Sequence, residues 1–243
     1  THERTSPYPN MRPGAHGAEA RPMSVEPQPV IRRTRVEDIP ALIELQRRVY
    51  PTIEPWSPDK LRQQVDMFPQ GQLMAEMDGQ PVGCASSLVV LWNEWAESHT
   101  WEEITSAGTF EHHNPDGRTL YGAEVFVAPE ARGSGVGHLL YEGRRDICRE
   151  FNLKRIIACG RLPGYHRHAA GMSAEFYARK VVWGDFFDPV LSFQLREGFS
   201  YCGVVEGYLP DDEESGGFAS IIVWLNPDYD DTLPNQLIKE DIP

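Results

Sequence analysis

The chain has 243 residues, of which 40% are hydrophobic and 24% are charged, and its formal net charge at pH 7 is −13. This composition is that of a globular protein with one large domain or two small ones. The acidic balance argues against nucleic-acid binding, because Lys and Arg contacts to phosphates supply most of that affinity. It suits a cationic partner such as an amine.

The sequence also bears on location and redox state. It contains no apolar run long enough to span a membrane and begins with no charged-then-apolar leader, so we expect a soluble cytoplasmic protein without membrane contact. The four cysteines, Cys84, Cys148, Cys159 and Cys202, form no Cys-x-x-Cys pair. We therefore expect reduced thiols in the core rather than disulfides or a zinc site.

Residues 1–28 are rich in proline, glycine and alanine and show no apolar period. Such a segment is predicted to form an extended arm rather than part of a domain core. One hypothesis is that the arm wraps around a second copy of the chain and so builds a homodimer.

The next part of the chain alternates predicted strands and capped helices. Thr34 and Glu37 have the spacing of a capping box, and Ser57 followed by Pro58 is typical of a helix start. Asp78-Gly79 predicts a tight hairpin turn. The predicted order is a strand at 30–34, helices at 36–49 and 57–67, and strands at 72–77 and 81–92.

Residues 93–118 interrupt this pattern as a first insertion. Thr100 and Glu103 predict a short capped helix. The adjacent His112 and His113 lie in a turn-forming cluster with no third ligand at a suitable spacing, so we predict a polar loop and no metal site. The tryptophans of this region either wall an acceptor pocket or pack the insertion against the core; they are Trp92, Trp95 and Trp101.

A strand predicted over 120–127 leads into a glycine-rich loop and then a helix. The first N–H groups of such a helix lack intrahelical partners, and the helix dipole adds partial positive charge, so a phosphate or pyrophosphate binds there. Gly133, Gly135 and Gly137 can adopt positive φ and let a ligand approach the backbone closely.

The spacing of this loop excludes two common nucleotide motifs. The dinucleotide fingerprint needs a third glycine where His138 stands, and the ATP or GTP loop needs a lysine that this loop lacks. From Val127 to Gly137 the segment reads Val-x-Pro-x-x-Arg-Gly-x-Gly-Val-Gly. It resembles the acetyl-CoA motif of the GNAT superfamily of N-acetyltransferases. Arg132 lies at the mouth of the loop, where a guanidinium can grip a phosphate.

The resemblance implies an α/β fold with a mixed, mostly antiparallel central sheet and a parallel, splayed strand pair, flanked by helices. The pair would be the strands at 120–127 and 154–159, joined by a helix over 135–151. The implied cofactor is acetyl-CoA, with its pantetheine arm along the exposed backbone of the first strand. The implied cofactor-binding residues are Val125, Phe126, Val127, Arg132, Gly133, Ser134, Gly135, Val136, Gly137 and His138.

Residues 160–187 form a second insertion, whose first loop leaves the carboxyl end of a strand, where active-site loops lie in α/β sheets. Ser173 and Asp188 are predicted to cap the next helices, and Gly198 to end the second of them. The remaining predicted elements are helices at 173–182 and 188–196, strands at 201–208 and 218–225, and a loose polar tail over 230–243, so that the domain spans 29–229.

Three segments look like the GNAT domain that precedes a nitrilase-type carbon–nitrogen hydrolase in some bacterial proteins. They are 160–168, 172–175 and 208–215. The chain carries no Glu, Lys and Cys set for amide hydrolysis. We therefore expect either a stand-alone relative of such domains or one part of a larger protein.

The resemblance implies that an acceptor amine attacks the thioester directly, which requires a general base to neutralise the amine. Glu124 is the first candidate, because a carboxylate in an apolar strand can have a raised pKa. Tyr121 is the competing candidate. Strand alternation does not decide which face Glu124 occupies, because GNAT strands carry a bulge at this point. The Val127 N–H, or that of its strand neighbour, is the natural donor to the developing oxyanion.

The general acid is left open. GNAT enzymes commonly place a tyrosine four residues before the glycine that ends the last helix, and here that position holds Gln194. An amide cannot give up a proton at neutral pH. The role falls to no residue at all or to one of the second insertion, namely Tyr165, His166, His168 or Tyr177.

We therefore expect an acetyl-CoA-dependent N-acetyltransferase whose acceptor is a small-molecule amine or a peptide. Two alternatives stay open. One is a non-catalytic module that binds acyl-CoA and regulates a partner, and the other is a structural partner domain of an amide hydrolase.

Overall fold

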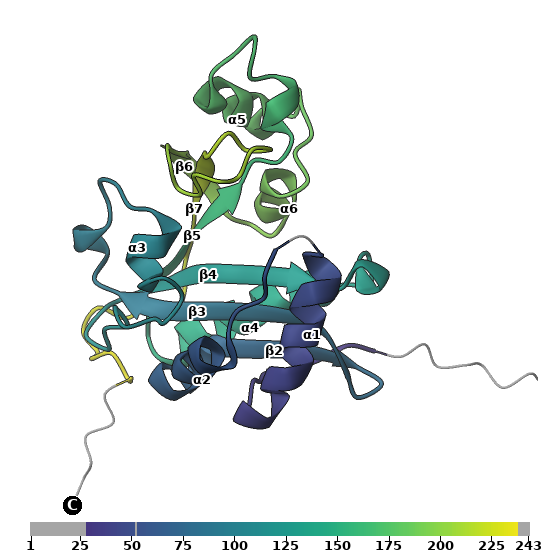
Figure 1. The fold of residues 1–243 in the computed structure, drawn as a ribbon. Helices are drawn as coiled ribbons and strands as arrows, with labels where there is room; N and C mark the ends of the chain where they lie inside the picture. The colour runs from purple at the N-terminus through teal and green to yellow at the C-terminus, as the bar shows by residue number, and fades with distance from the viewer. Residues whose placement is uncertain (1–27, 52, 238–243) are drawn as a thin grey trace, which may run out of the picture.

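The computed structural model describes residues 28–51 and 53–237, which fold around one mixed sheet (Figure 1). The strand order is β1-β2-β3-β4-β5-β7-β6, and β4 with β5 is the parallel pair in an otherwise antiparallel arrangement. This confirms the expected fold class. The strands are β1 (Val30–Arg33), β2 (Gln72–Met77), β3 (Gln80–Val90), β4 (Thr119–Val127), β5 (Arg155–Arg161), β6 (Ser200–Val205) and β7 (Ala219–Leu225).

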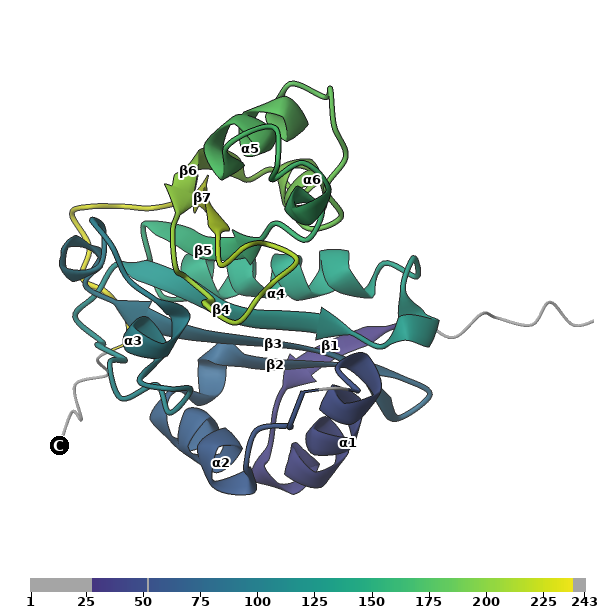
Figure 2. The ribbon, with the colours of Figure 1, turned by 45° about the horizontal axis from the view of Figure 1, so that its top comes forward.

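Helices cover both faces of the sheet. Two of them, α1 and α2, lie on one face of β2 and β3, and α4 crosses the opposite face (Figures 1 and 2). The residues described include no helix with the length and apolarity to cross a bilayer. The helices are α1 (Ile39–Val49), α2 (Pro58–Met67), α3 (Trp101–Thr105), α4 (Val136–Glu150), α5 (Ala174–Val182) and α6 (Leu191–Arg196).

The parallel strands β4 and β5 separate part-way along their length. Their pairing ends at Gly122 opposite Ala158, although β4 continues to Val127 and β5 to Arg161. Figure 1 shows β5 turning away from β4 toward α5 and α6. The splayed pair expected from the sequence is therefore present, and it leaves one edge of β4 without a strand partner.

A β-bulge lies where the splay begins. Ser86 of β3 pairs with Glu124, and the next residue, Ser87, pairs with Gly122, so Ala123 is the extra residue. A bulge of this kind places two successive side chains on the same face of the sheet. Glu124 therefore lies on the face that carries α1, where its carboxylate contacts Tyr50 at the end of that helix.

Most predicted caps are confirmed. Ser57 accepts a hydrogen bond from the Lys60 N–H, and Thr100 forms the predicted box with Glu103. The predicted box at Thr34 and Glu37 is wrong, because the Thr34 hydroxyl is buried without a hydrogen-bond partner. A short 3-10 turn precedes α1 instead, and the capping interaction is shifted by one residue along the chain. The Asp38 carboxylate accepts a hydrogen bond from the Arg35 N–H at 2.7 Å.

Three further expectations differ from the structure. Cys202 is exposed rather than in the core. The last residues described do not form a loose tail, since the amide of the buried Asn235 donates to the carbonyls of Pro115 and Gly117. Tyr208 lies beyond the end of β6 and is buried in the turn that follows. Residues 1–27 of the predicted arm lie outside the residues described.

Candidate functional site

The glycine-rich loop before α4 forms an open turn. Arg132, Gly133, Ser134 and Gly135 are exposed. Gly133 has φ +80° and Gly135, the N-cap of α4, has φ +88°, and a Cβ at either position would meet nothing within 4 Å. The first backbone bond of the helix is the one from the Leu139 N–H to the Gly135 carbonyl. The preceding N–H groups of the first turn therefore point out of the helix and can bind an anion.

Gly137 does not have the role expected for it. It is helical without a positive φ, and a Cβ there would lie 3.1 Å from the ring of Phe193 on α6. This glycine lets α6 approach α4 closely. Val136 is likewise buried, at 1% exposure, and its side chain lies against Gly83 of β3. Both residues can offer only their backbone N–H groups to a ligand.

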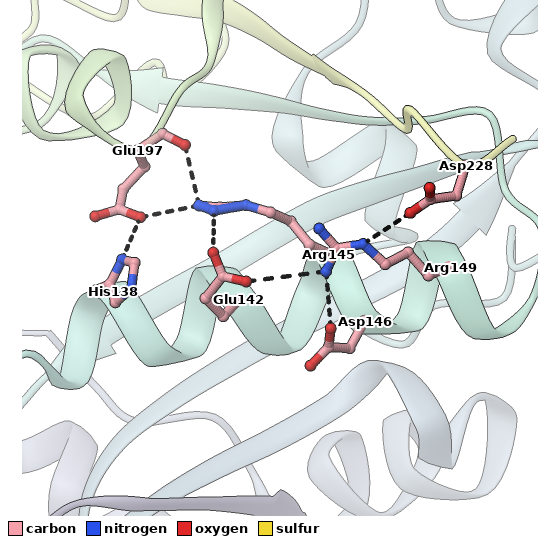
Figure 3. A network of polar contacts seen from close by, with 7 residues as sticks. All are labelled: His138, Glu142, Arg145, Asp146, Arg149, Glu197 and Asp228. Carbon is pink, nitrogen blue, oxygen red and sulfur yellow. Dashed lines mark hydrogen bonds and ion pairs between the residues drawn. The ribbon is translucent and has the colours of Figure 1, made fainter.

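Two polar side chains of the loop already have partners. The Ser134 hydroxyl donates to the Ala131 carbonyl at 2.6 Å. The His138 ring lies against the Glu197 carboxylate, with Nδ1 2.9 Å from Oε2. Figure 3 shows this contact as the end of a network that ties α4 to the end of α6 through Arg145. Both side chains therefore stabilise the loop and helix.

The open edge of β4 presents unpaired backbone to the gap. The Ala128 N–H donates to the Val82 carbonyl at 2.8 Å. Because hydrogen bonding alternates along an antiparallel strand, Phe126 also bonds β3, and Val125 and Val127 direct their N–H and C=O groups away from it. These two residues therefore line the edge that β5 has left. Phe126 contributes packing, with its ring edge-on to Tyr50 at 5.9 Å.

Glu124 lies at this same edge. Its Oε1 accepts a hydrogen bond from the Tyr50 hydroxyl at 3.3 Å, and its carboxylate also accepts from the Val125 N–H. Burial raises the pKa of Glu124 to about 7, although these hydrogen bonds and the charges of Arg144 and Arg161 oppose the rise. A carboxyl with that pKa can gain and lose a proton near neutrality, as a general base must.

Tyr121, the competing base, is fully buried in a hydrogen-bonded chain. His99 Nδ1 lies 2.8 Å from the Trp95 carbonyl and donates to it, because a carbonyl can only accept. The other nitrogen of the neutral ring, Nε2, therefore accepts from the Tyr121 hydroxyl at 3.1 Å. The Tyr208 hydroxyl lies 2.7 Å from that of Tyr121. Burial raises the pKa of Tyr121 well above its usual value. A hydroxyl that donates to a histidine and resists ionisation can stabilise the fold, but it is poorly suited to accept a proton as a general base.

The candidates of the second insertion hold that insertion together. The Tyr165 hydroxyl donates to the Met172 carbonyl at 3.1 Å, and the exposed His166 ring lies 2.8 Å from the Pro163 carbonyl. Tyr177 donates to the buried Asp188. In the part of the chain that is described, no interaction joins Tyr165 or His166 to Glu124, so the structure does not bring these predicted catalytic residues together.

Gln194 occupies the position expected for a catalytic tyrosine. It is buried, and its Nε2 donates to the Tyr141 hydroxyl at 3.3 Å. Gly160 of β5 makes room for it, since a Cβ there would lie 2.4 Å from the amide oxygen. The side chain therefore fills the space between α4, α6 and β5 without offering a titrating group.

Several residues at the site were not predicted. Tyr50 comes from the end of α1, 74 residues before Glu124. Arg161 ends β5 and makes paired hydrogen bonds to the Asp212 carboxylate at 2.6 and 2.5 Å, with a third to Glu214 at 3.1 Å. Its charge acts on both Tyr50 and Glu124. The loop between α1 and α2 contributes Trp56, which stacks on Trp101 with ring centroids 5.8 Å apart.

The histidine pair of the first insertion is separated by its surroundings. His113 stacks on Phe68 and accepts the Val89 N–H, and burial lowers its pKa to about 4. His112 instead packs against Trp95. Across the described ranges, no group of at least three His, Cys, Asp or Glu side chains could hold a metal ion.

Comparison with known proteins agrees with this geometry. The model of the acetyltransferase (GNAT) family matches residues 39–179, which include α1, the splayed strand β4, the glycine loop and α4. The chain therefore belongs to the GNAT family of acetyltransferases.

Two relatives from Bacillus subtilis (strain 168) extend the comparison. The uncharacterized N-acetyltransferase YkwB is 36% identical over 203 residues, which cover 82% of this chain and 89% of YkwB. The probable hydrolase YhcX is 43% identical over 211 residues, which cover 87% of this chain and 40% of YhcX. The chain thus spans well under half of YhcX.

A solved structure shares the fold closely. The GNAT-like decarboxylase GphF, solved in complex with isobutyryl-CoA, is 26% identical and superimposes with a TM-score of 0.72. The match covers 81% of this chain and 98% of GphF. The similarity therefore extends beyond the family motif to the arrangement of the whole domain.

Proposed function

We propose that this protein transfers the acetyl group of acetyl-CoA to a primary amine, with Glu124 as the general base. Acetyl-CoA is the cofactor of the family, and the open loop around Gly133 and Gly135 fits its pyrophosphate. One observation carries the proposal. A carboxyl group whose pKa is raised to about 7 lies at the unpaired edge of β4, next to Val125.

The backbone divides the binding work between two places. The N–H groups that begin α4 and the Arg132 guanidinium would hold the pyrophosphate. The N–H and C=O groups of Val127 and the C=O group of Val125 would pair with the amides of the pantetheine arm, as an added strand would. Acetyl-CoA supplies an activated acetyl group when bound there.

Glu124 has the proton-transfer role in this proposal. Its ionised carboxylate accepts a proton from the acceptor ammonium, directly or through one water, and leaves a neutral amine able to attack. Holding the amine and the cofactor in one site supports direct transfer without a covalent acyl-enzyme. The net charge of −13 favours a cationic acceptor, either a small amine or a peptide amino terminus.

The test is a screen of amines and peptides for acetyl-CoA-dependent thiol release. The wild-type protein should acetylate at least one amine, and Gly135→Glu should abolish both turnover and acetyl-CoA binding, because a carboxylate would then occupy the anion site. Binding of acetyl-CoA without turnover on any amine would instead support a non-catalytic acyl-CoA-binding module.

A second candidate is decarboxylation of an acyl-CoA that carries a free carboxylate. It is favoured by the similarity to the GNAT-like decarboxylase GphF and by Gln194, which leaves no acid where amine acetyltransferases commonly have one. Release of carbon dioxide from malonyl-CoA in the absence of any amine would support it. Because the chain spans only 40% of YhcX, the hydrolase activity in that relative's name is not proposed for this chain.

A further inference from the structure

Arg144 is the largest side chain in the fully buried interior of the described residues, with 1% of its surface exposed. It comes from α4 and reaches the bulge between β3 and β4. One amino group, Nη2, donates to the carbonyls of Ser86 at 3.0 Å and of Glu124, and Nε donates to the Ser87 hydroxyl at 3.1 Å. The guanidinium thus bonds both strands at the point where their register shifts.

The surroundings are built to receive this group. A Cβ on Gly122 would lie 3.0 Å from Nη1 of Arg144, so any larger residue there would press on the guanidinium. The Tyr141 ring lies beneath it, with its centroid 5.6 Å from the guanidinium carbon. Its hydrogen-bond partners are two carbonyls and a hydroxyl, with no carboxylate among the bonds found for it in the described structure.

A buried cation without a bonded counter-charge is costly, because burial removes its hydration and neutral acceptors replace it only in part. Burial accordingly lowers the pKa of Arg144. A hydrophobic side chain would avoid this cost, but it would leave the two carbonyls and the Ser87 hydroxyl without their donor. The position of the charge, directly behind the backbone of Glu124, is therefore the feature that requires an explanation.

We propose that Arg144 is a positioning residue for Glu124, which clamps the bulge that turns this carboxylate toward the open edge of β4 and stabilises its ionised form. The proposal rests on the proposed role of Glu124 as the base. The clamp acts through the Glu124 carbonyl, and the charge acts through space on the carboxylate of the same residue. Arg144 itself does not touch the reacting atoms.

The charged and titratable groups around Glu124 define how Arg144 acts. They come from every element packed against it: Tyr50 from α1, Cys84 from β3, Arg144 from α4, Arg161 from β5 and Tyr208 from the turn after β6. Arg161 is already held by Asp212 and Glu214, which offset its charge. No carboxylate among the described residues pairs with Arg144 in this way, so its charge remains to favour the ionised form of Glu124.

The sign of the effect follows directly. Burial raises the pKa of Glu124 to about 7, against the hydrogen bonds from Tyr50 and the Val125 N–H and the charges of Arg144 and Arg161, which lower it. Removing the charge should therefore move the titration of Glu124 to higher pH. A rise of roughly one pH unit would lower the ionised fraction of Glu124 at pH 7 from about one half to about one tenth, a roughly fivefold loss.

The experiment compares Arg144→Gln and Arg144→Lys with a matched control, Arg145→Gln. Arg145 is also buried on α4, at 6% exposure, but it forms ion pairs with Glu142 and Glu197 instead of bonding the bulge (Figure 3). The titration of Glu124 is followed by ¹³C NMR of glutamate-labelled protein, assigned by loss of the signal in Glu124→Gln. The pH dependence of kcat/KM and the calorimetric affinity for acetyl-CoA are measured on the same variants.

We expect Arg144→Gln to shift the Glu124 titration and the rate profile upward together, with acetyl-CoA affinity within a few-fold of wild type. Arg144→Lys should keep most of the titration but lose rate, because a lysine has no counterpart of Nε to hold the Ser87 hydroxyl while its ammonium bonds the two carbonyls. Arg145→Gln should lower thermal stability and leave the titration unchanged. If Arg144→Gln does not fold, the Lys variant decides the matter.

The experiment distinguishes failure of the Arg144 proposal from failure of the proposed role of Glu124. An unchanged Glu124 titration in Arg144→Gln, or wild-type titration and rate in Arg144→Lys, would overturn the positioning role. A wild-type Glu124 that titrates as proposed while Glu124→Gln remains fully active would instead refute the role of Glu124 as base. The NMR readout does not depend on turnover, so it separates the two.

Discussion

The burial of Glu124 predicts an unusual relation between stability and pH. The pKa of this carboxyl is about 7 in the folded protein, against an ordinary value of 4.5. A carboxyl with a raised folded pKa contributes stability that is fully present below the ordinary value and is lost as pH rises through the folded value. Replacing Glu124 with glutamine removes the ionisation and keeps the shape, so the variant should avoid that loss.

The magnitude follows from the two values. They differ by about 2.5 pH units, and each unit corresponds to about 1.4 kcal/mol. Glu124→Gln should thus be more stable than wild type by up to about 3 kcal/mol at pH 8, and by little at pH 4. For a chain of this size that difference is roughly 6–12 °C in Tm. Glu124 would then lower the stability of the folded protein at neutral and alkaline pH while serving as the general base.

The assay is thermal unfolding of both proteins across pH 4–9, followed by circular dichroism. Taking the difference in Tm between the two proteins at each pH cancels every other titrating group. The difference should grow as pH rises from about 5 to about 8. A difference that stays constant across this range, or a variant less stable than wild type at pH 8, would refute the reasoning that burial dominates the ionisation of Glu124.

Two further predictions concern backbone and buried hydroxyl groups. Gly135→Ala and Gly198→Ala place a Cβ at φ +88° and +82° in open space, so each should lower the free energy of unfolding in urea by about 1–2 kcal/mol. Only Gly135→Ala should also weaken acetyl-CoA binding in calorimetry. Equal losses of binding in the two variants would argue against the placement of the anion site. Tyr121→Phe removes the hydroxyl that bonds His99 Nε2 and the Tyr208 hydroxyl, so it should cost about 1–3 kcal/mol. It should keep the wild-type dependence of rate on pH; loss of that dependence would restore Tyr121 as the base.

Local signals predicted the framework and the conformation of the glycine-rich loop well. The Ser57-Pro58 pair and the Thr100 box act within one turn of helix, so sequence spacing alone determines them. The glycine loop is equally local, and Gly133 and Gly135 adopt the positive φ that their residue type allows. Gly137 shows the limit of such reasoning, because its absent side chain serves a contact with Phe193, a residue distant in sequence.

The residues that surround Glu124 carry no comparable signal. Arg144 falls on what the sequence suggests is a polar helix face, yet it is buried because the bulge across the sheet supplies acceptors for its guanidinium. Tyr50 and Arg161 reach the site from the ends of distant elements. Only the tertiary fold brings them together, so no periodicity or spacing identifies them.

The measurement that tests the central claim most directly is the pH dependence of kcat/KM for wild type and Glu124→Gln with one acetylated amine. If Glu124 is the base, the wild-type rate rises through about pH 7 and levels off above it, and the glutamine variant is slower by roughly 10²–10⁴-fold with no such rise. Equal rates and an unchanged profile in Glu124→Gln would contradict the account.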